Sequence, residues 1–114
     1  MVKGLAFRLV DGTYAIIGMR AETRADYKKI ADALGIGRAK LKAAESADLI
    51  RDLHMTPGGV VPLPINGAAV VFDRQVLELD AVYCGTGRPD STLEIASSDL
   101  VRIAGGKAAD LTKT

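Results

Sequence analysis

Apolar residues dominate two β-rich runs at the start of the chain, over residues 5–10 and 13–19, and a polar pair stands between them. Runs of this kind, bounded by turn residues, predict two neighbouring strands. The pair is Asp11-Gly12, a combination that favours a two-residue hairpin turn. We therefore expect an antiparallel hairpin near the N-terminus, with Lys3 just before its first strand.

The next stretch changes from strand-like to helical spacing. Thr23 and Asp26 are good N-cap residues, and Gly35 suits the left-handed position that ends many helices. Between them, apolar residues recur at i, i+3, i+4 and i+7, which indicates one buried helical face. These residues are Tyr27, Ile30, Ala31 and Leu34. The pattern predicts a helix that ends at Gly35.

Beyond this helix the apolar pattern breaks into short elements. The apolar face of the next helix should carry Leu49, Ile50 and Leu53. A continuous apolar run predicts a strand buried on both faces, and an alternating one predicts a half-buried strand. The expected elements are a strand over 40–43 with Leu41 facing inward, a helix over 47–53 capped by Ser46, a strand over 68–72, a helical turn over 73–77, strands over 81–84 and 92–96, a helix capped by Ser97 or Ser98, and an edge strand over 108–111.

About six short strands and about three helices without strict alternation predict a single α+β domain with a curved mixed β-sheet. The 114 residues, 48% of them hydrophobic, suffice for one core. The formal net charge of +1 gives no strong general field, so any nucleic-acid contact needs a local basic patch. One cysteine excludes an internal disulfide, and no membrane-length apolar run or secretory signal is present. We therefore expect a cytoplasmic protein with no membrane partner.

Two glycines stand between three prolines in residues 56–64. Proline lacks a backbone N–H and fixes φ, so this stretch cannot be a regular helix or a central strand. Glycine leaves room for another group to approach the backbone. The stretch predicts a stiff loop, which is either a rigid surface connection or a site where the amides of Gly58, Gly59 and Val60 face a ligand.

Five motifs and an initial lysine follow each other in an order that resembles a known family. They are Lys3, Asp-x-Lys-Lys at 26–29, Pro-Gly-Gly-Val-x-Pro at 57–62, Leu-x-Leu-Asp-x-Val-Tyr at 77–83, Gly-x-Gly-Arg at 85–88, and Leu-x-Ile with Asp-Leu-Val-Arg-Ile over 93–103. Nearly the whole chain resembles the YbaK-like domain, also called the prolyl-tRNA synthetase-associated editing domain. Family members usually carry some tens of residues before the lysine, so we expect residues 1–114 to form such a domain without that segment.

The resemblance implies an aminoacyl-tRNA deacylase that removes a small amino acid, such as alanine, cysteine or proline, from the 3′ acceptor end of a proline tRNA. The family has an active-site lysine, a Gly-x-x-x-Pro loop and glycines that line the same pocket, and the resemblance implies the same three features in this chain. Carried over by position, the catalytic residues are Lys3, Gly58, Gly59 and Val60, and the substrate-binding residues are Pro62, Gly85, Thr86, Gly87 and Arg88. The chain departs from the family's pattern at His54 and at Leu63-Pro64.

The residues themselves suit ester hydrolysis without an obvious nucleophile. Backbone amides of a glycine loop can stabilise an oxyanion, and Lys3 can hold a phosphate or a carbonyl oxygen. Without the resemblance, the sequence favours a solvated terminal lysine at position 3. Cys84 ends an apolar strand, which favours an inert thiol, and His54 should lie at a helix end or on the surface. With one histidine and one cysteine we expect no metal site and no cofactor. The substrate's own ribose hydroxyl would then help to activate water.

Basic residues could form a phosphate-binding rim, or simply a solvated face. They are Lys28, Lys29, Lys40, Lys42, Arg88 and Arg102. Two other functions remain open from the sequence. One is a module of the same fold that binds tRNA or an aminoacyl-adenosine without hydrolysis, and the other is a structural homodimer formed through exposed sheet edges.

Overall fold

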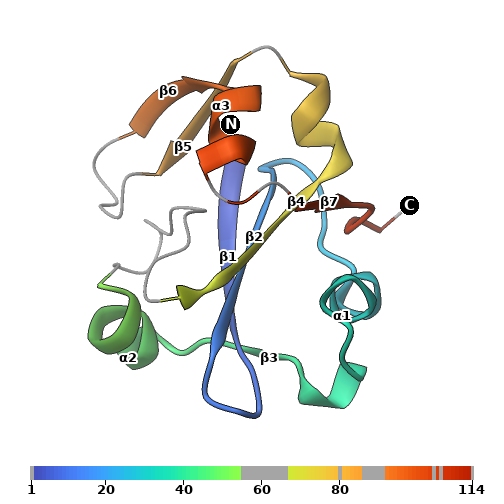
Figure 1. Cartoon of the computed structure of the whole chain (residues 1–114), viewed down its shortest axis with the longest axis vertical. Helices are drawn as coiled ribbons and strands as arrows, with labels where there is room; N and C mark the ends of the chain where they lie inside the picture. Colours follow the sequence, from blue (N-terminus) through green and yellow to red (C-terminus); the bar gives the residue numbers. More distant parts are fainter. Residues whose placement is uncertain are drawn as a thin grey trace.

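A mixed sheet organises the chain, with its first two strands at the centre (Figure 1). The computed structural model describes residues 2–54, 67–79, 81–85, 92–103, 105 and 107–113. Within this part the sheet has seven strands; six follow the order β6-β5-β1-β2-β4-β7, and the seventh, β3, pairs with β1 outside this order. The strands are β1 (Val2–Arg8), β2 (Tyr14–Arg20), β3 (Lys42–Ala43), β4 (Ala69–Asp73), β5 (Ala81–Gly85), β6 (Thr92–Ala96) and β7 (Lys107–Ala109). The predicted α+β fold with a mixed sheet is confirmed.

The hairpin of β1 and β2 is antiparallel, as predicted, but its turn is not the two-residue type. The N–H of Leu9 donates to Thr13 O at 2.8 Å, and the N–H of Gly12 donates to Leu9 O at 3.0 Å. Gly12 has a φ of 86°. These features define a three-residue loop that ends on a left-handed glycine. Asp11 stabilises the loop because its carboxylate accepts the N–H of Thr13 at 3.0 Å.

The two faces of the sheet carry separate hydrophobic cores, and β2 contributes to both. Ile16 packs on one face and Ile17 on the other, and both are fully buried. Strand β4, predicted to be buried on both faces, does the same with Phe72 and Val71. It is parallel to β2 and to β7, so the C-terminal strand lies at the edge expected for it. In Figure 1 the helices α1 and α2 flank the central hairpin from opposite sides.

Helix α1 (Tyr27–Leu34) has the predicted ends. The Asp26 carboxylate accepts the N–H of Lys29 at 3.1 Å, which satisfies one of the free donors at the helix start. Gly35 has a φ of 72° and its N–H bonds back to the last turn, which ends the helix. Ile30 and Ala31 are buried against the sheet.

The second helix ends at Leu53 as predicted but differs from its prediction at the start. It begins as α2 (Ser46–Asp48) with Glu45, not Ser46, as the N-cap, because the Asp48 carboxylate accepts the N–H of Glu45 at 3.1 Å. It continues as a π-helical turn, Leu49–Leu53. Leu49 and Leu53 are buried as predicted, whereas Ile50 is 58% exposed.

The remaining elements are close to the predictions. The strand expected over 40–43 is a 3₁₀ turn (Arg38–Lys40) followed by β3, with Leu41 buried between them. A second 3₁₀ turn (Arg74–Glu78) follows β4, and α3 (Ser97–Ile103) starts at Ser97, so this residue lies within the helix and does not cap it. None of the described helices has the length and apolar character needed to cross a membrane.

Candidate functional site

Lys3 lies on the face of β1 that is covered by α1. Side chains alternate along a strand, so residue 3 lies on the same face as Phe7. Phe7 belongs to the hydrophobic core between the sheet and α1. The Lys3 Nζ donates a hydrogen bond of 2.6 Å to Thr23 O, in the turn after β2. That turn is closed by hydrogen bonds from the Thr23 N–H and hydroxyl to Arg20 O, at 3.0 and 2.6 Å. One donor of the Lys3 ammonium is therefore engaged, and within the described residues its other two donors make no further hydrogen bond, so they can bind a ligand.

A hollow of about 660 Å³ opens beside Lys3. Its walls come from β1, the turn between β2 and α1, the first turn of α1, the 3₁₀ turn at 38–40 and the C-terminal tail. The lining residues are Lys3, Thr23, Arg24, Ala25, Asp26, Tyr27, Lys28, Arg38 and Lys113. Segments far apart in the sequence therefore meet at one site.

This hollow is strongly cationic although the chain carries a net charge of only +1. Five of its lining side chains are basic: Lys3, Arg24, Lys28, Arg38 and Lys113. Among the described residues of the lining, the one acidic side chain is Asp26, whose carboxylate caps α1. The local excess of positive charge favours an anionic ligand.

The C-terminal tail is fixed against the hollow by its backbone. The N–H of Asp26 donates to Leu111 O at 2.9 Å, and the N–H of Lys113 donates to Arg24 O at 2.9 Å. The Lys29 side chain also holds the tail, because its Nζ donates hydrogen bonds to Asp110 Oδ2 and to Thr112 O, both at 2.9 Å. This contact holds the pKa of the Asp110 carboxyl below its usual value. Together these hydrogen bonds place Lys113 beside Arg24.

An aromatic residue supports one wall. The guanidinium carbon of Arg38 lies 4.9 Å from the centre of the Tyr27 ring, and the Arg38 Nη1 donates to Leu41 O at 3.3 Å. The Tyr27 ring meets Phe7 edge-on at a centroid distance of 5.3 Å. Phe7 is buried, so its contact with Tyr27 fixes the position of the Tyr27 ring and of Arg38 above it.

Most of the other predicted site residues lie outside the described part of the chain: Gly58, Gly59, Val60, Pro62, Thr86, Gly87 and Arg88. Gly85 is the last residue of β5. Strand β5 is parallel to β1 with Val2 opposite Cys84, so Gly85 comes next to Lys3 on the neighbouring strand. The backbone therefore brings these two predicted site residues side by side.

The predicted basic rim does not form one surface in the described residues. Of the five that the structure describes, only Lys28 lines the hollow around Lys3, and Arg88 lies outside the described residues. Lys29 is paired with Asp110, Arg102 is paired with Asp99 at 2.8 Å, and Lys40 and Lys42 line a separate hollow. Sequence reasoning missed Arg24, Arg38 and Lys113, because no local pattern shows that these three residues meet.

His54 and possible metal ligands were also considered as site residues from the sequence. His54 is exposed and ends the π-helical turn with a φ of 55°, which confirms the prediction of a helix-terminal histidine. Within the ranges that the structure describes, no three histidine, cysteine or acidic side chains gather as metal ligands would.

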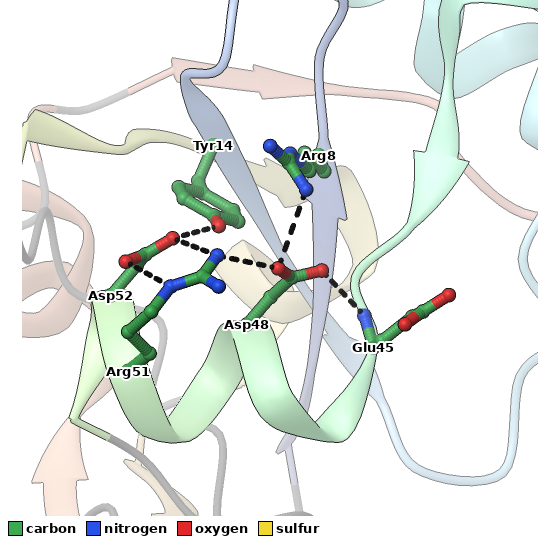
Figure 2. Close-up of polar contacts among 6 residues, drawn as sticks. All are labelled: Arg8, Tyr14, Glu45, Asp48, Arg51 and Asp52. Carbon is green, nitrogen blue, oxygen red and sulfur yellow. Dashed lines mark hydrogen bonds and ion pairs between the residues drawn. The ribbon is translucent and has the colours of Figure 1, made fainter.

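A second cluster of charged residues connects α2 and the π-helical turn to the hairpin (Figure 2). Arg51 bonds to Asp52 through Nε at 2.9 Å and to Asp48 through Nη2 at 3.0 Å, and the Arg8 Nη1 lies 3.5 Å from the same Asp48 oxygen. The Tyr14 hydroxyl donates to Asp52. Arg51 holds the pKa of Asp52 well below its usual range, whereas Asp52 raises the pKa of Tyr14. The side chains satisfy one another, which indicates a structural role.

Comparison with known proteins identifies the family of the chain. The model of the aminoacyl-tRNA editing domain matches residues 1–103. No curated protein matches the chain by sequence.

Solved structures share the fold. A proposed trans-editing enzyme for prolyl tRNA synthetase superimposes with a TM-score of 0.88 at 23% identity, over 99% of this chain and 70% of that one. The hypothetical protein APE2540 gives 0.86 at 24% identity, over 99% and 74%. A proposed signal transduction protein from Marinobacter aquaeolei VT8 gives 0.77 at 22% identity, over 99% of this chain and 25% of that one.

Proposed function

The chain belongs to the aminoacyl-tRNA editing domain family, and we propose that it hydrolyses the ester between a wrongly attached amino acid and the terminal adenosine of a tRNA. The observation that carries this proposal is the position of Lys3. Its ammonium is anchored by Thr23 O at the wall of a hollow with five basic side chains. A charged tRNA end brings phosphates and an ester carbonyl, and both are attracted by such a site.

The proposed reaction needs one water molecule and stabilisation of the developing negative charge. The oxygen of water forms a bond to the ester carbonyl carbon, the bond from that carbon to the ribose oxygen breaks, and the ribose oxygen takes up a proton. Lys3 would face the carbonyl oxygen with one of its remaining donors. We propose that the amides of Gly58, Gly59 and Val60 complete the oxyanion site, and that Pro62, Gly85, Thr86, Gly87 and Arg88 hold the substrate.

The proposed substrate carries a small amino acid such as alanine, cysteine or proline. One structural neighbour is a proposed trans-editing enzyme for prolyl tRNA synthetase, so a proline tRNA is the first substrate to examine. None of the described residues that line the hollow is a cysteine or a histidine. In the proposed mechanism the neighbouring ribose hydroxyl of the substrate helps to activate water.

The test is a deacylation assay with alanyl-, cysteinyl- and prolyl-tRNA made with the same proline tRNA. We expect release of at least one of these amino acids at a rate well above spontaneous hydrolysis. Binding of all three without release would contradict the proposal and would favour a binding module of the same fold.

A further inference from the structure

Four basic residues line the Lys3 hollow beyond the one that the proposed hydrolysis uses. Resting on the proposed function, we propose that this hollow binds the single-stranded 3′ end of the tRNA, with a backbone phosphate held by Arg24, Lys28 and Lys113 and an unpaired base stacked on the guanidinium of Arg38. The proposal assigns a nucleotide subsite next to Lys3.

The Arg38 guanidinium has the geometry of a stacking platform. The guanidinium carbon lies over the Tyr27 ring, 4.9 Å from the ring centre, and Nη1 donates to Leu41 O at 3.3 Å. These two contacts hold the guanidinium group in place, and Arg38 itself is exposed. The proposal places the base on the side of this group that faces away from Tyr27. Unpaired bases stack on arginine planes as they do on aromatic rings.

The phosphate position follows from three cations on three different elements. Arg24 lies in the turn after β2, Lys28 in the first turn of α1, and Lys113 in the tail. Among the described residues, no ion pair or side-chain hydrogen bond occupies the charged groups of these three residues. Asp26, the one carboxylate of the lining, is engaged by the N–H of Lys29. The charge of the three cations therefore remains available for a phosphate.

The size of the hollow favours one or two nucleotides. Its volume of about 660 Å³ is that of a pocket for a small molecule. A double helix is too wide to enter it, whereas a single strand can place one phosphate and one base there.

The hollow lined by Lys40 and Lys42 lacks these features and provides a control. It measures about 420 Å³ and also contains Arg8, but two carboxylates, Glu45 and Asp48, line it as well. No aromatic side chain is among its lining residues. Replacing Lys42 changes the net charge by the same amount as replacing Lys28.

The test measures equilibrium binding of an uncharged RNA minihelix that ends in a single-stranded CCA. Arg38→Ala and Arg38→Lys should each weaken binding by about 5- to 100-fold, because lysine keeps the charge but has no plane to stack on. Lys28→Gln should weaken binding and lower the slope of log affinity against log salt by about 1, while Lys42→Gln leaves both unchanged. Melting curves check that each variant is folded.

The proposal is overturned if Arg38→Lys binds as tightly as the wild type, or if Lys42→Gln weakens binding as much as Lys28→Gln. Hydrolysis of a 3′-aminoacyl-adenosine, which has no backbone phosphate, separates this inference from the proposed function. Lys28→Gln should raise KM on the charged tRNA by a larger factor than it raises KM on that small ester. A wild type that binds the minihelix as predicted but cleaves neither ester would contradict the hydrolase and support the subsite. If the wild type cleaves the esters but the Arg38 and Lys28 variants bind the minihelix as tightly as the wild type, the subsite is overturned and the hydrolase is not.

Discussion

The buried carboxylate of Asp73 accepts a hydrogen bond of 2.9 Å from the backbone N–H of Leu111, which lies 38 residues later in the chain. Its second oxygen accepts the N–H of Gln75 at 3.1 Å and caps the 3₁₀ turn after β4. One side chain thus connects the end of β4 to the tail that brings Lys113 to the cationic hollow.

Replacing Asp73 should be costly because it leaves the Leu111 N–H buried without an acceptor. We expect Asp73→Ala to lower the free energy of unfolding by about 2–4 kcal/mol, from the unpaired donor and the lost cap. Asp99→Ala is the matched control, since the contact that it removes among the described residues is an exposed ion pair with Arg102, and it should change that free energy by about 0.5 kcal/mol or less. Urea denaturation measures both, and equal effects would contradict the structural role of Asp73.

Two glycines near the end of α1 allow a test of backbone conformation alone. A methyl group at Gly35 or Gly37 would meet no atom within 4 Å, but Gly35 has a φ of 72° and Gly37 a φ of −72°. Gly35→Ala should therefore lower the free energy of unfolding by about 1–2 kcal/mol. Gly37→Ala should be neutral or slightly stabilising. The two thermal melts give the comparison, and a Gly37→Ala variant that is the less stable of the two would contradict the assigned helix end.

The pH dependence of stability should report on the Tyr14–Asp52 contact. The pKa of Asp52 is lowered in the folded protein, so its contribution is present above about pH 4, the unfolded pKa, and is lost as the pH falls through the lower folded value. The pKa of Tyr14 is raised, so its contribution is present below about pH 10 and is lost above it.

Unfolding by urea across the pH range tests both signs. In Asp52→Asn the fall in stability below pH 4 should become shallower than in the wild type. In Tyr14→Phe the stability near pH 7 should drop by about 1 kcal/mol from the lost hydrogen bond, and the loss above pH 10 should diminish. Unchanged acid and alkaline limbs in the two variants would show that the contact does not form in solution.

Local patterns predicted the elements well where one signal dominates. The spacing of Ile30 and Ala31 and the caps at Asp26 and Gly35 determine α1, and all were predicted. The resemblance to an editing domain, carried by motif order, is confirmed at the level of the family. The hairpin turn was wrong because Asp-Gly suits a two-residue turn and also ends a three-residue loop.

The composition of the site could not be predicted in the same way. Arg24, Arg38 and Lys113 meet only because the tail docks on the turn before α1, through backbone hydrogen bonds such as that from Lys113 N–H to Arg24 O. Backbone groups are the same in every residue, so the sequence carries no local signal for this contact. The prediction that Ile50 is buried was wrong because Leu49–Leu53 form a π-helical turn, which changes the residues that share a face.

The glycine loop gives a prediction that separates a pocket from a surface connection. If the amides at 58–60 face the substrate, Gly59→Val should reduce turnover far more than stability, because a branched side chain fills the space that the carbonyl needs. If the loop only connects two elements, stability should fall by about 1–3 kcal/mol and activity should fall only with unfolding. Both quantities are measured on one preparation, well below the melting temperature. Wild-type activity per folded molecule would remove the loop from the site.

The most direct test of the central claim is the deacylation rate of Lys3→Ala on mischarged proline tRNA. If Lys3 stabilises the developing oxyanion, the rate should fall by about 100-fold or more. The melting temperature should change little, since the one hydrogen bond to Thr23 O contributes about 1 kcal/mol. Lys42→Ala, in the separate hollow, is the matched control and should keep the wild-type rate. Lys3→Ala with the wild-type rate per folded molecule would contradict the account.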